Sequence, residues 1–110
     1  MSQIKEVELS IEHAKGLVAR KDQALKLTDN KDFKALVLQG YFVDEASRLA
    51  LLSSDPMLDA EQRADVMQGV LALGYFKRYM SGIIQFGRMA ENDLKAHTET
   101  LSELHNEGAE

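Results

Sequence analysis

The residues that could carry chemistry in this 110-residue chain are few, and their spacing matches no catalytic or metal-binding motif. The histidines are His13, His97 and His105, and no two of them have the i,i+4 spacing that brings two imidazoles to one metal ion. The chain has no glycine-rich phosphate-binding motif, and its serines and threonines stand outside any nucleophile motif. The sequence therefore predicts no catalytic residue, no metal site and no cofactor, and a protein that is not an enzyme.

The most unusual polar feature is Asp44 followed one helical turn later by Arg48, in a segment that is otherwise largely apolar. On a helix these two side chains share one face. They could recognise a carboxylate or the backbone of a partner, or they could form a buried ion pair that fixes the register of their helix. The apolar surroundings favour the second interpretation, so we predict a buried Asp44–Arg48 pair.

A second group of residues combines bases with aromatic rings in a stretch that contains no acid between Asp65 and Glu91. Three bases are too few to bind nucleic acid tightly through release of counterions. They could instead meet an acidic segment of a neighbouring copy, since the two are complementary in sign. This predicted basic-aromatic patch consists of Tyr75, Lys77, Arg78, Tyr79 and Arg88.

The net charge of −5 is concentrated at the C-terminal end. Residues 91–110 hold six acids and one base, and the remainder of the chain is neutral. A nucleic-acid-binding protein would show a net basic face, so nucleic acid is not an expected partner. The simplest interpretation of this acidic arm is a solvated helix end.

Other classes of protein are also disfavoured. The chain has no cysteine, which excludes a disulfide framework and thiolate metal sites. The longest apolar-looking stretch, 66–90, contains three basic residues and does not fit an ordinary membrane span. The N-terminal residues lack the apolar core of a secretory signal.

The pattern of apolar residues predicts an all-α fold of three helices at about 2–28, 31–52 and 60–105. The first helix carries an apolar seam with spacings of three and four, in which Lys21 fills one position. Asp29 or Asn30 is expected to cap the second helix, and Asp59 with Gln62 has the form of a capping box for the third. The second helix is apolar around most of its circumference, which is typical of burial between neighbours.

Length indicates how these helices pack. A helix over 60–105 is roughly 68 Å long at 1.5 Å per residue, and the two shorter helices were expected to leave part of it projecting. The predicted organisation is a coiled-coil-like antiparallel bundle over 1–90 with an acidic helical arm over 91–110 in the same domain. The apolar residues of the arm would then need another chain, which predicts a homo-oligomer or an obligate partner. Its partner-binding residues are expected to be Leu94, Leu101 and Leu104.

Three sequence elements resemble a group of small, coil-containing proteins of tailed bacteriophages that are encoded near virion structure and assembly genes. They are Lys31-Asp-Phe-Lys with Leu38-Gln-Gly-Tyr-Phe-Val-Asp-Glu-Ala-Ser-Arg-Leu49, then Ser54-Asp55-Pro56, then Arg63-Ala64-Asp65. The resemblance implies a phage protein of the virion or the host cytoplasm, with itself or phage structural proteins as partners. It implies a non-enzymatic role in virion structure or assembly. The alternative is a phage-encoded inhibitor of a host enzyme or defence factor, whose acidic arm imitates nucleic-acid charge.

Overall fold

The computed structural model describes residues 2–108, and within them the chain is helical except for its loops. The elements are α1 (Gln3–Thr28), α2 (Lys31–Phe33), η1 (Lys34–Glu45), α3 (Ala46–Ser53) and α4 (Ala60–Asn106). The segments α2, η1 and α3 follow one another without a break and form one helix, here called the second helix. The predicted all-α fold of three helices is confirmed, and each predicted end lies within one residue of the observed end.

Local hydrogen bonds explain where two of the helices begin. The Asn30 side chain accepts a hydrogen bond of 2.9 Å from the backbone N–H of Phe33, as an N-cap does. At the start of α4, the N–H of Gln62 donates to Asp59 Oδ1 at 2.8 Å, while the N–H of Asp59 donates to Gln62 Oε1 at 3.0 Å. This reciprocal pair is the capping box expected from the sequence.

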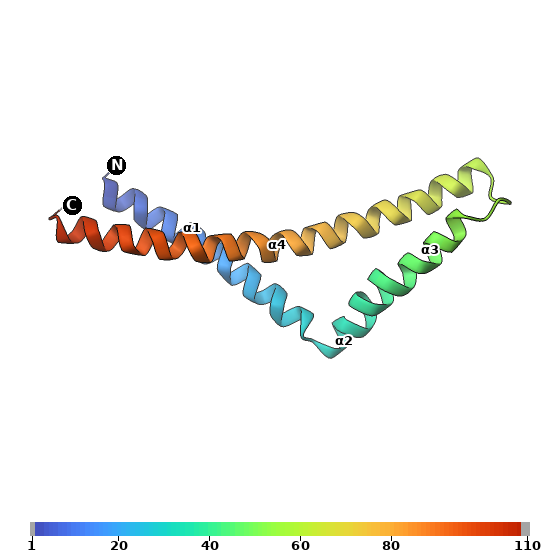
Figure 1. The fold of residues 1–110 in the computed structure, drawn as a ribbon, viewed down its shortest axis with the longest axis horizontal. Coiled ribbons are helices and arrows are strands. Elements are labelled where there is room, and N and C mark those ends of the chain that lie inside the picture. The colour runs from blue at the N-terminus through green and yellow to red at the C-terminus, as the bar shows by residue number, and fades with distance from the viewer. Residues whose placement is uncertain (1, 109–110) are drawn as a thin grey trace. The chain divides into compact units, whose positions relative to one another are not determined.

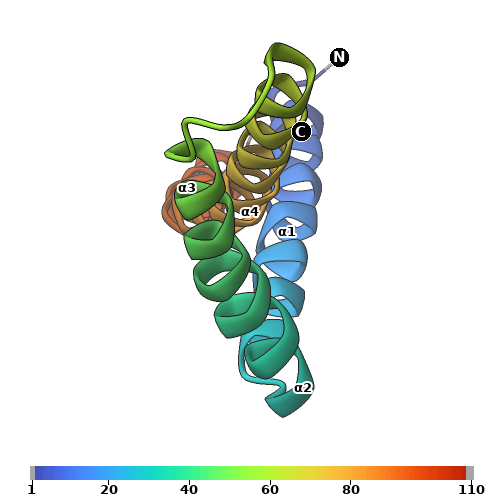
Figure 2. The ribbon, with the colours of Figure 1, turned by 90° about the vertical axis from the view of Figure 1, so that its right-hand side faces the viewer.

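The loop between α3 and α4 is fastened by one side chain. The Arg63 guanidinium donates to the carbonyl oxygens of Ser53 and Asp55, at 2.9 and 3.1 Å. The Asp55 carboxylate also accepts a hydrogen bond of 2.9 Å from the N–H of Met57, across Pro56. Figure 2 shows this loop joining the two helices. Charge-assisted bonds to backbone carbonyls therefore help to hold the second helix and the start of α4 together.

The contacts divide the chain into two compact units. The terminal unit combines residues up to Leu25 with those from Gly82 onward, and the hairpin unit comprises Lys26–Ser81. The helix α4 runs unbroken from Ala60 to Asn106 and contributes its first part to the hairpin unit and its second part to the terminal unit. The borders between the two units follow Leu25 and Ser81, whereas the sequence suggested that an arm begins after residue 90.

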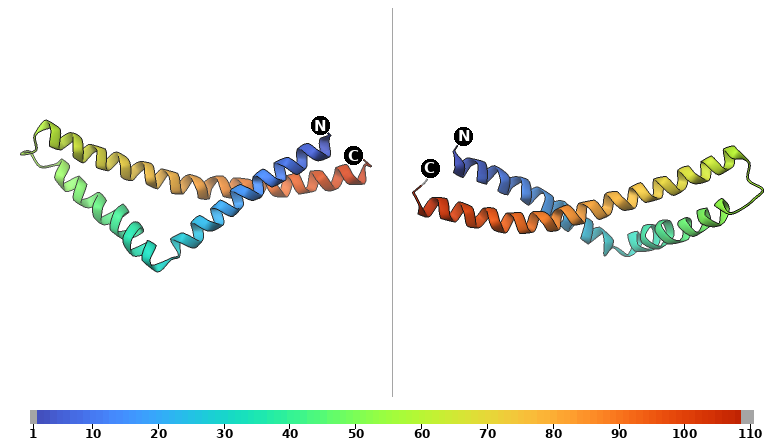
Figure 3. Two further views of the ribbon diagram at one scale, coloured as in Figure 1. Left: turned by 180° about the vertical axis from the view of Figure 1, so that it is seen from behind. Right: turned by 45° about the horizontal axis from the view of Figure 1, so that its top comes forward.

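In the terminal unit, α1 runs antiparallel to the second part of α4 and packs against it while crossing it obliquely, as Figures 1 and 3 show. The predicted seam of α1 is the face that packs, and Lys21 occupies a seam position as the spacing indicated. On α4 the facing residues Gly87 and Ala90 are buried. The buried residues of α1 are Ile4, Ile11, Ala14, Lys21 and Ala24.

In the hairpin unit, the second helix packs against the first part of α4 through one apolar face. Leu49 is buried, and it lies so close to Gly69 that a Cβ there would be 3.2 Å from its Cδ2 atom. Tyr41 and Phe42 both contact Phe76, with ring centroids at 6.0 and 5.5 Å. A small residue on α4 and an aromatic cluster thus hold this pair of helices together.

The middle of the second helix is π-helical, whereas the sequence predicted a regular α-helix. The segment η1 covers 12 residues. Its wider turn, with bonds to the residue five positions away, rotates consecutive side chains by less than an α-helix does. Tyr41 and Phe42, adjacent in sequence, can therefore both face Phe76. Within this segment a Cβ at Gly40 would come 3.0 Å from the carbonyl oxygen of Ala35, a close contact that glycine avoids.

The expectation that the second helix is buried between neighbours is wrong. Leu36 and Leu51 are each 74% exposed, and Val43 is 48% exposed. Within the hairpin unit only α4 lies against this helix, so only one of its faces is covered. An apolar circumference predicted several neighbours, and within the hairpin unit this helix has a single neighbour.

Candidate functional site

The leucines of the acidic arm lie on the face that packs within the chain. Leu94, Leu101 and Leu104 are half-buried, and they continue the three-and-four spacing that begins at the buried Gly87 and Ala90. The expectation that the arm projects uncovered is wrong, because α1 lies along it. Both segments are about 38 Å long at 1.5 Å per residue, so the first helix matches the second part of α4 and leaves little overhang.

The predicted basic-aromatic patch is exposed. Tyr75 and Tyr79 are 65% and 59% exposed, and Lys77, Arg78 and Arg88 are exposed as well. All five residues lie on α4, but helical geometry places them on different sides of it, since Lys77 and Arg88 are more than a quarter turn from the tyrosines. The faces of α4 that pack within each unit leave all five residues exposed.

The predicted buried ion pair between Asp44 and Arg48 is not formed. Both residues are exposed. The Arg48 guanidinium pairs with Glu45, three residues earlier, and the Asp44 carboxylate accepts a hydrogen bond of 3.0 Å from the Gln39 side-chain amide. The reason lies in the second helix, whose outer face has no neighbour within the hairpin unit and leaves both charges in water. These surface contacts contribute little to stability.

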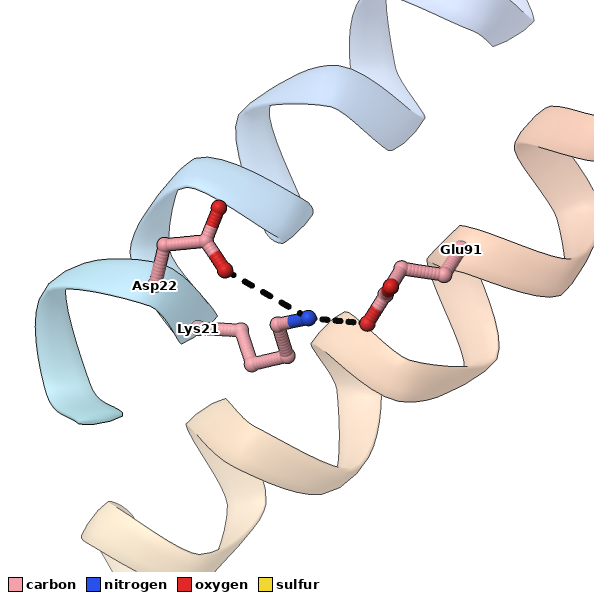
Figure 4. Close-up of polar contacts among 3 residues, drawn as sticks. All are labelled: Lys21, Asp22 and Glu91. Atoms are coloured by element: carbon pink, nitrogen blue, oxygen red, sulfur yellow. Dashed lines mark hydrogen bonds and ion pairs between the residues drawn. The ribbon is translucent and has the colours of Figure 1, made fainter.

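A different polar contact joins Lys21 of α1 to Glu91 of α4 (Figure 4). The ammonium of Lys21 donates a hydrogen bond to Glu91 Oε1 and lies 3.4 Å from Asp22 Oδ1. Lys21 is 7% exposed overall, although its ammonium reaches carboxylates that are themselves 47% and 65% exposed. The aliphatic stem packs in the seam while the charged end reaches the edge of the interface.

Gly87 makes room for this lysine. A Cβ at position 87 would overlap the Cβ of Lys21, and it would lie 2.8 Å from Lys21 Cγ and 3.0 Å from the carbonyl oxygen of Leu17. The helices therefore approach each other closely at Gly87, where α4 has no side chain. The sequence placed Lys21 in the seam of the first helix, but no rule of spacing paired it with Gly87 on α4. The signal that was missed is a large residue and a glycine at matching positions of two antiparallel seams.

The pKa of the Lys21 ammonium is raised above its ordinary value by the hydrogen bond to Glu91, and Asp22 adds to this effect. Desolvation acts in the opposite direction and is outweighed. Because the pKa is higher in the folded chain, the stabilisation is fully present below the ordinary lysine value of about 10.4. It is lost as the pH rises through the folded value.

Alkaline pH is therefore expected to weaken the terminal unit through Lys21. The experiment compares thermal unfolding of the chain and of the Lys21→Met variant between pH 7 and pH 11.5. The difference in melting temperature between the two proteins should be constant up to about pH 10. Above that pH, the melting temperature of the unsubstituted chain should fall by a few degrees relative to that of the variant. All other ionisable groups are the same in both proteins, so their contributions cancel in the difference. If the difference in melting temperature stays constant to pH 11.5, Lys21 is not the cause of a loss of stability at alkaline pH.

A shallow groove of about 330 Å³ lies along the same interface and contains two of the histidines. Its polar lining is Ser10 and His13 from α1 with Asp93 and His97 from α4. Within residues 2–108, no group of histidines and carboxylates is arranged to hold a metal ion. The third histidine, His105, is exposed near the end of α4. The groove thus brings His13 and His97 to one surface without forming a ligand set.

The described residues leave many large apolar side chains in contact with water. Six apolar residues are buried, and no described side chain has less than 2% of its surface exposed. Among residues 2–108, no stretch of helix combines the length and the apolarity that crossing a bilayer requires. The feature with most capacity for interaction is the exposed apolar surface of the helices.

Comparison of the chain with protein families, with curated proteins and with solved structures finds no match.

Proposed function

We propose that this chain is a bacteriophage protein that acts in virion structure or assembly, by binding other helices rather than by catalysis. The observation that carries the proposal is the exposed apolar surface, above all the three aromatic rings of Tyr75, Tyr79 and Phe86, which are 58–65% exposed. Water-exposed aromatic groups at helical spacing are typical of surfaces that bind a partner. The phage origin is supported by the resemblance of the segments around Gly40, Pro56 and Arg63 described above.

The expected partners are further copies of the chain or structural proteins of the same phage, in the host cytoplasm or in the virion. A role as inhibitor of a host factor through charge mimicry gains less support, because Glu91 of the acidic arm is already paired with Lys21. The remaining acids of the arm lie on a helix whose apolar residues pack against α1. Binding is proposed to use the uncharged surface rather than the acidic one.

Mass spectrometry of purified virions of the encoding phage tests this function. A structural component is expected at a defined copy number relative to the major capsid protein, and an assembly factor is expected in capsid precursors but not in mature particles. Particles and precursors that both lack the chain, with normal virion yield after deletion of its gene, would overturn the proposal.

A further inference from the structure

The first part of α4 carries an apolar stripe on the side that faces away from the second helix. Gly69 and Phe76 pack against the second helix within the hairpin unit. At about 100° per residue, Met67 and Leu71 lie roughly half a turn away from these two positions. Their side chains are 49% and 46% exposed. The second helix therefore leaves this stripe uncovered.

The positions of the stripe recur with the spacing of a coiled-coil seam. Counted from the first residue of α4, the steps are four, three, four, three and four residues. All the positions are exposed, and all belong to one helix and to the hairpin unit. Tyr75, which is 65% exposed, borders the stripe. This outer seam consists of Ala60, Ala64, Met67, Leu71, Gly74 and Arg78.

The order of residues along the outer seam fits an antiparallel pair of two copies. When Met67 of each copy lies over Leu71 of the other, the two largest apolar residues of the seam meet at a two-fold axis. Ala64 then lies beside Gly74 and Tyr75 of the other copy, so that a large ring covers small residues. Each of these contacts occurs twice, as a two-fold symmetric interface requires.

Charge selects the antiparallel orientation and favours a second copy as the partner. Residues 59–65 contain three acids and one base, whereas residues 75–78 contain two bases and no acid. Antiparallel pairing places the acidic segment of each copy against the basic segment of the other, with Arg78 over Ala60 and near Glu61. Parallel pairing would place like charges side by side. The outer seam is therefore complementary to itself in one orientation.

The exposed area is sufficient for a weak dimer. Met67, Val70, Leu71 and Tyr75 are 40–65% exposed, and at roughly 150–200 Å² per large side chain they offer roughly 300–400 Å² per copy. The alanines and the aliphatic stem of Arg78 bring the total for two copies to about 1,000 Å². Specific interfaces of this size are at the low end of the known range. A dissociation constant in roughly the micromolar range is expected.

We propose that two copies of the chain associate through the outer seam of α4, antiparallel, with the two-fold axis between Met67 and Leu71. The inference rests on the proposed function, which it deepens by naming one partner and the surface that binds it. The two fail separately, because self-association is tested on the purified full chain, whereas the function is tested on virions.

The first test measures the mass of the full chain by sedimentation equilibrium over a range of concentrations. The unsubstituted chain is expected to approach twice 12.3 kDa as the concentration rises. The double variant Met67→Glu, Leu71→Glu should weaken the dimer by about 100-fold or more, because it gathers four negative charges around the axis. Circular dichroism should show the same helix content for both proteins when they are monomeric, since both side chains are about half exposed within the chain.

A matched control uses exposed leucines outside the outer seam. The double variant Leu36→Glu, Leu51→Glu adds the same charge on the second helix, at two side chains that are each 74% exposed. It should dimerise as strongly as the unsubstituted chain. If this variant becomes monomeric while Met67→Glu, Leu71→Glu remains a dimer, the interface lies on the second helix and the proposal is overturned.

A charge exchange tests the register. Arg78→Glu places a glutamate near Glu61 of the other copy at both ends of the seam, and it should weaken the dimer by about 10-fold. Adding Glu61→Arg to the same chain should restore the affinity to within about threefold of the original, because opposite charges then face each other again. If the double variant stays as weak as Arg78→Glu alone, the proposed register is wrong.

Cross-linking tests the orientation. The chain has no cysteine, so a single introduced thiol reports one position. In the proposed dimer, the two copies of the exposed Gln68 are about 3 Å apart along the helix axis, whereas the two copies of Ala60 are about 27 Å apart. Gln68→Cys should therefore give a covalent dimer with a short bismaleimide, and Ala60→Cys should remain uncoupled. A parallel dimer would couple at both positions.

Three results overturn the inference as a whole. They are a monomer at concentrations up to about a millimolar, a dimer that Met67→Glu, Leu71→Glu leaves unchanged, and cross-linking at position 60 as strong as at position 68. Each experiment uses the purified full chain and needs no other protein.

Discussion

Replacing Gly87 with alanine is expected to separate α1 from α4 and to destabilise the terminal unit by about 3 kcal/mol or more. The added methyl group would overlap the stem of Lys21 and press against the carbonyl oxygen of Leu17 at 3.0 Å. The backbone of α1 cannot withdraw from this contact as a flexible side chain could, so the two helices must move apart. The buried seam, with the Lys21–Glu91 pair, would be lost with them.

The measurement is urea unfolding followed by circular dichroism, with hydrogen exchange to locate the change. Exchange should rise in α1 and in 82–106. The matched control is Gly16→Ala in α1, where nothing lies within 4 Å of the added Cβ. That variant should gain about 0.5–1 kcal/mol from helix propensity alone. If both alanine variants are stabilised alike, the two helices do not approach each other closely at Gly87.

Replacing Phe76 with alanine is expected to destabilise the hairpin unit by about 2–3 kcal/mol. The half-buried ring of Phe76 contacts Tyr41 at 6.0 Å and packs edge-on against Phe42 at 5.5 Å, between centroids. Its removal leaves both partners facing a gap that neighbouring side chains can fill only in part. The estimate is below that for a fully buried phenylalanine because water reaches part of the ring.

Hydrogen exchange again identifies the unit affected, with faster exchange expected in η1, α3 and the first part of α4. The matched control is Leu51→Ala in the same unit, since that side chain is 74% exposed and should change stability by less than about 0.5 kcal/mol. An equal effect of the two substitutions would show that the aromatic cluster does not hold the second helix to α4.

The sequence was sufficient to predict the helices and their ends. Asn30 and Asp59 act through hydrogen bonds to residues three positions away, so all the information for a cap is local. The seam of α1 was predictable for a similar reason, since its spacing of three and four is a property of one helix. The spacing placed Lys21 in that seam, but it did not predict Glu91 as the partner of Lys21.

The pairing of helices could not be predicted in the same way. Helix lengths suggested a projecting arm because both shorter helices were assigned to the first part of α4, whereas α1 packs against the second part. The prediction of a buried Asp44–Arg48 pair was wrong because an apolar circumference does not reveal how many neighbours a helix has. The contact of Lys21 with Gly87 and Glu91 joins residues about 70 positions apart, a distance at which spacing rules carry no information.

The terminal unit is made of two segments that flank the hairpin unit in sequence, and this has a consequence for the order of folding. The hairpin unit is a contiguous segment with short-range contacts, and it can form as soon as residues 26–81 have left the ribosome. The helix α1 is synthesised before the hairpin unit, but its partner on α4 is synthesised after it. Closing the 70-residue separation between Lys21 and Glu91 costs more chain entropy than closing the hairpin. During synthesis, the apolar seam of α1 thus remains exposed until the second part of α4 has been made, open to chaperones or to nascent copies on the same messenger RNA.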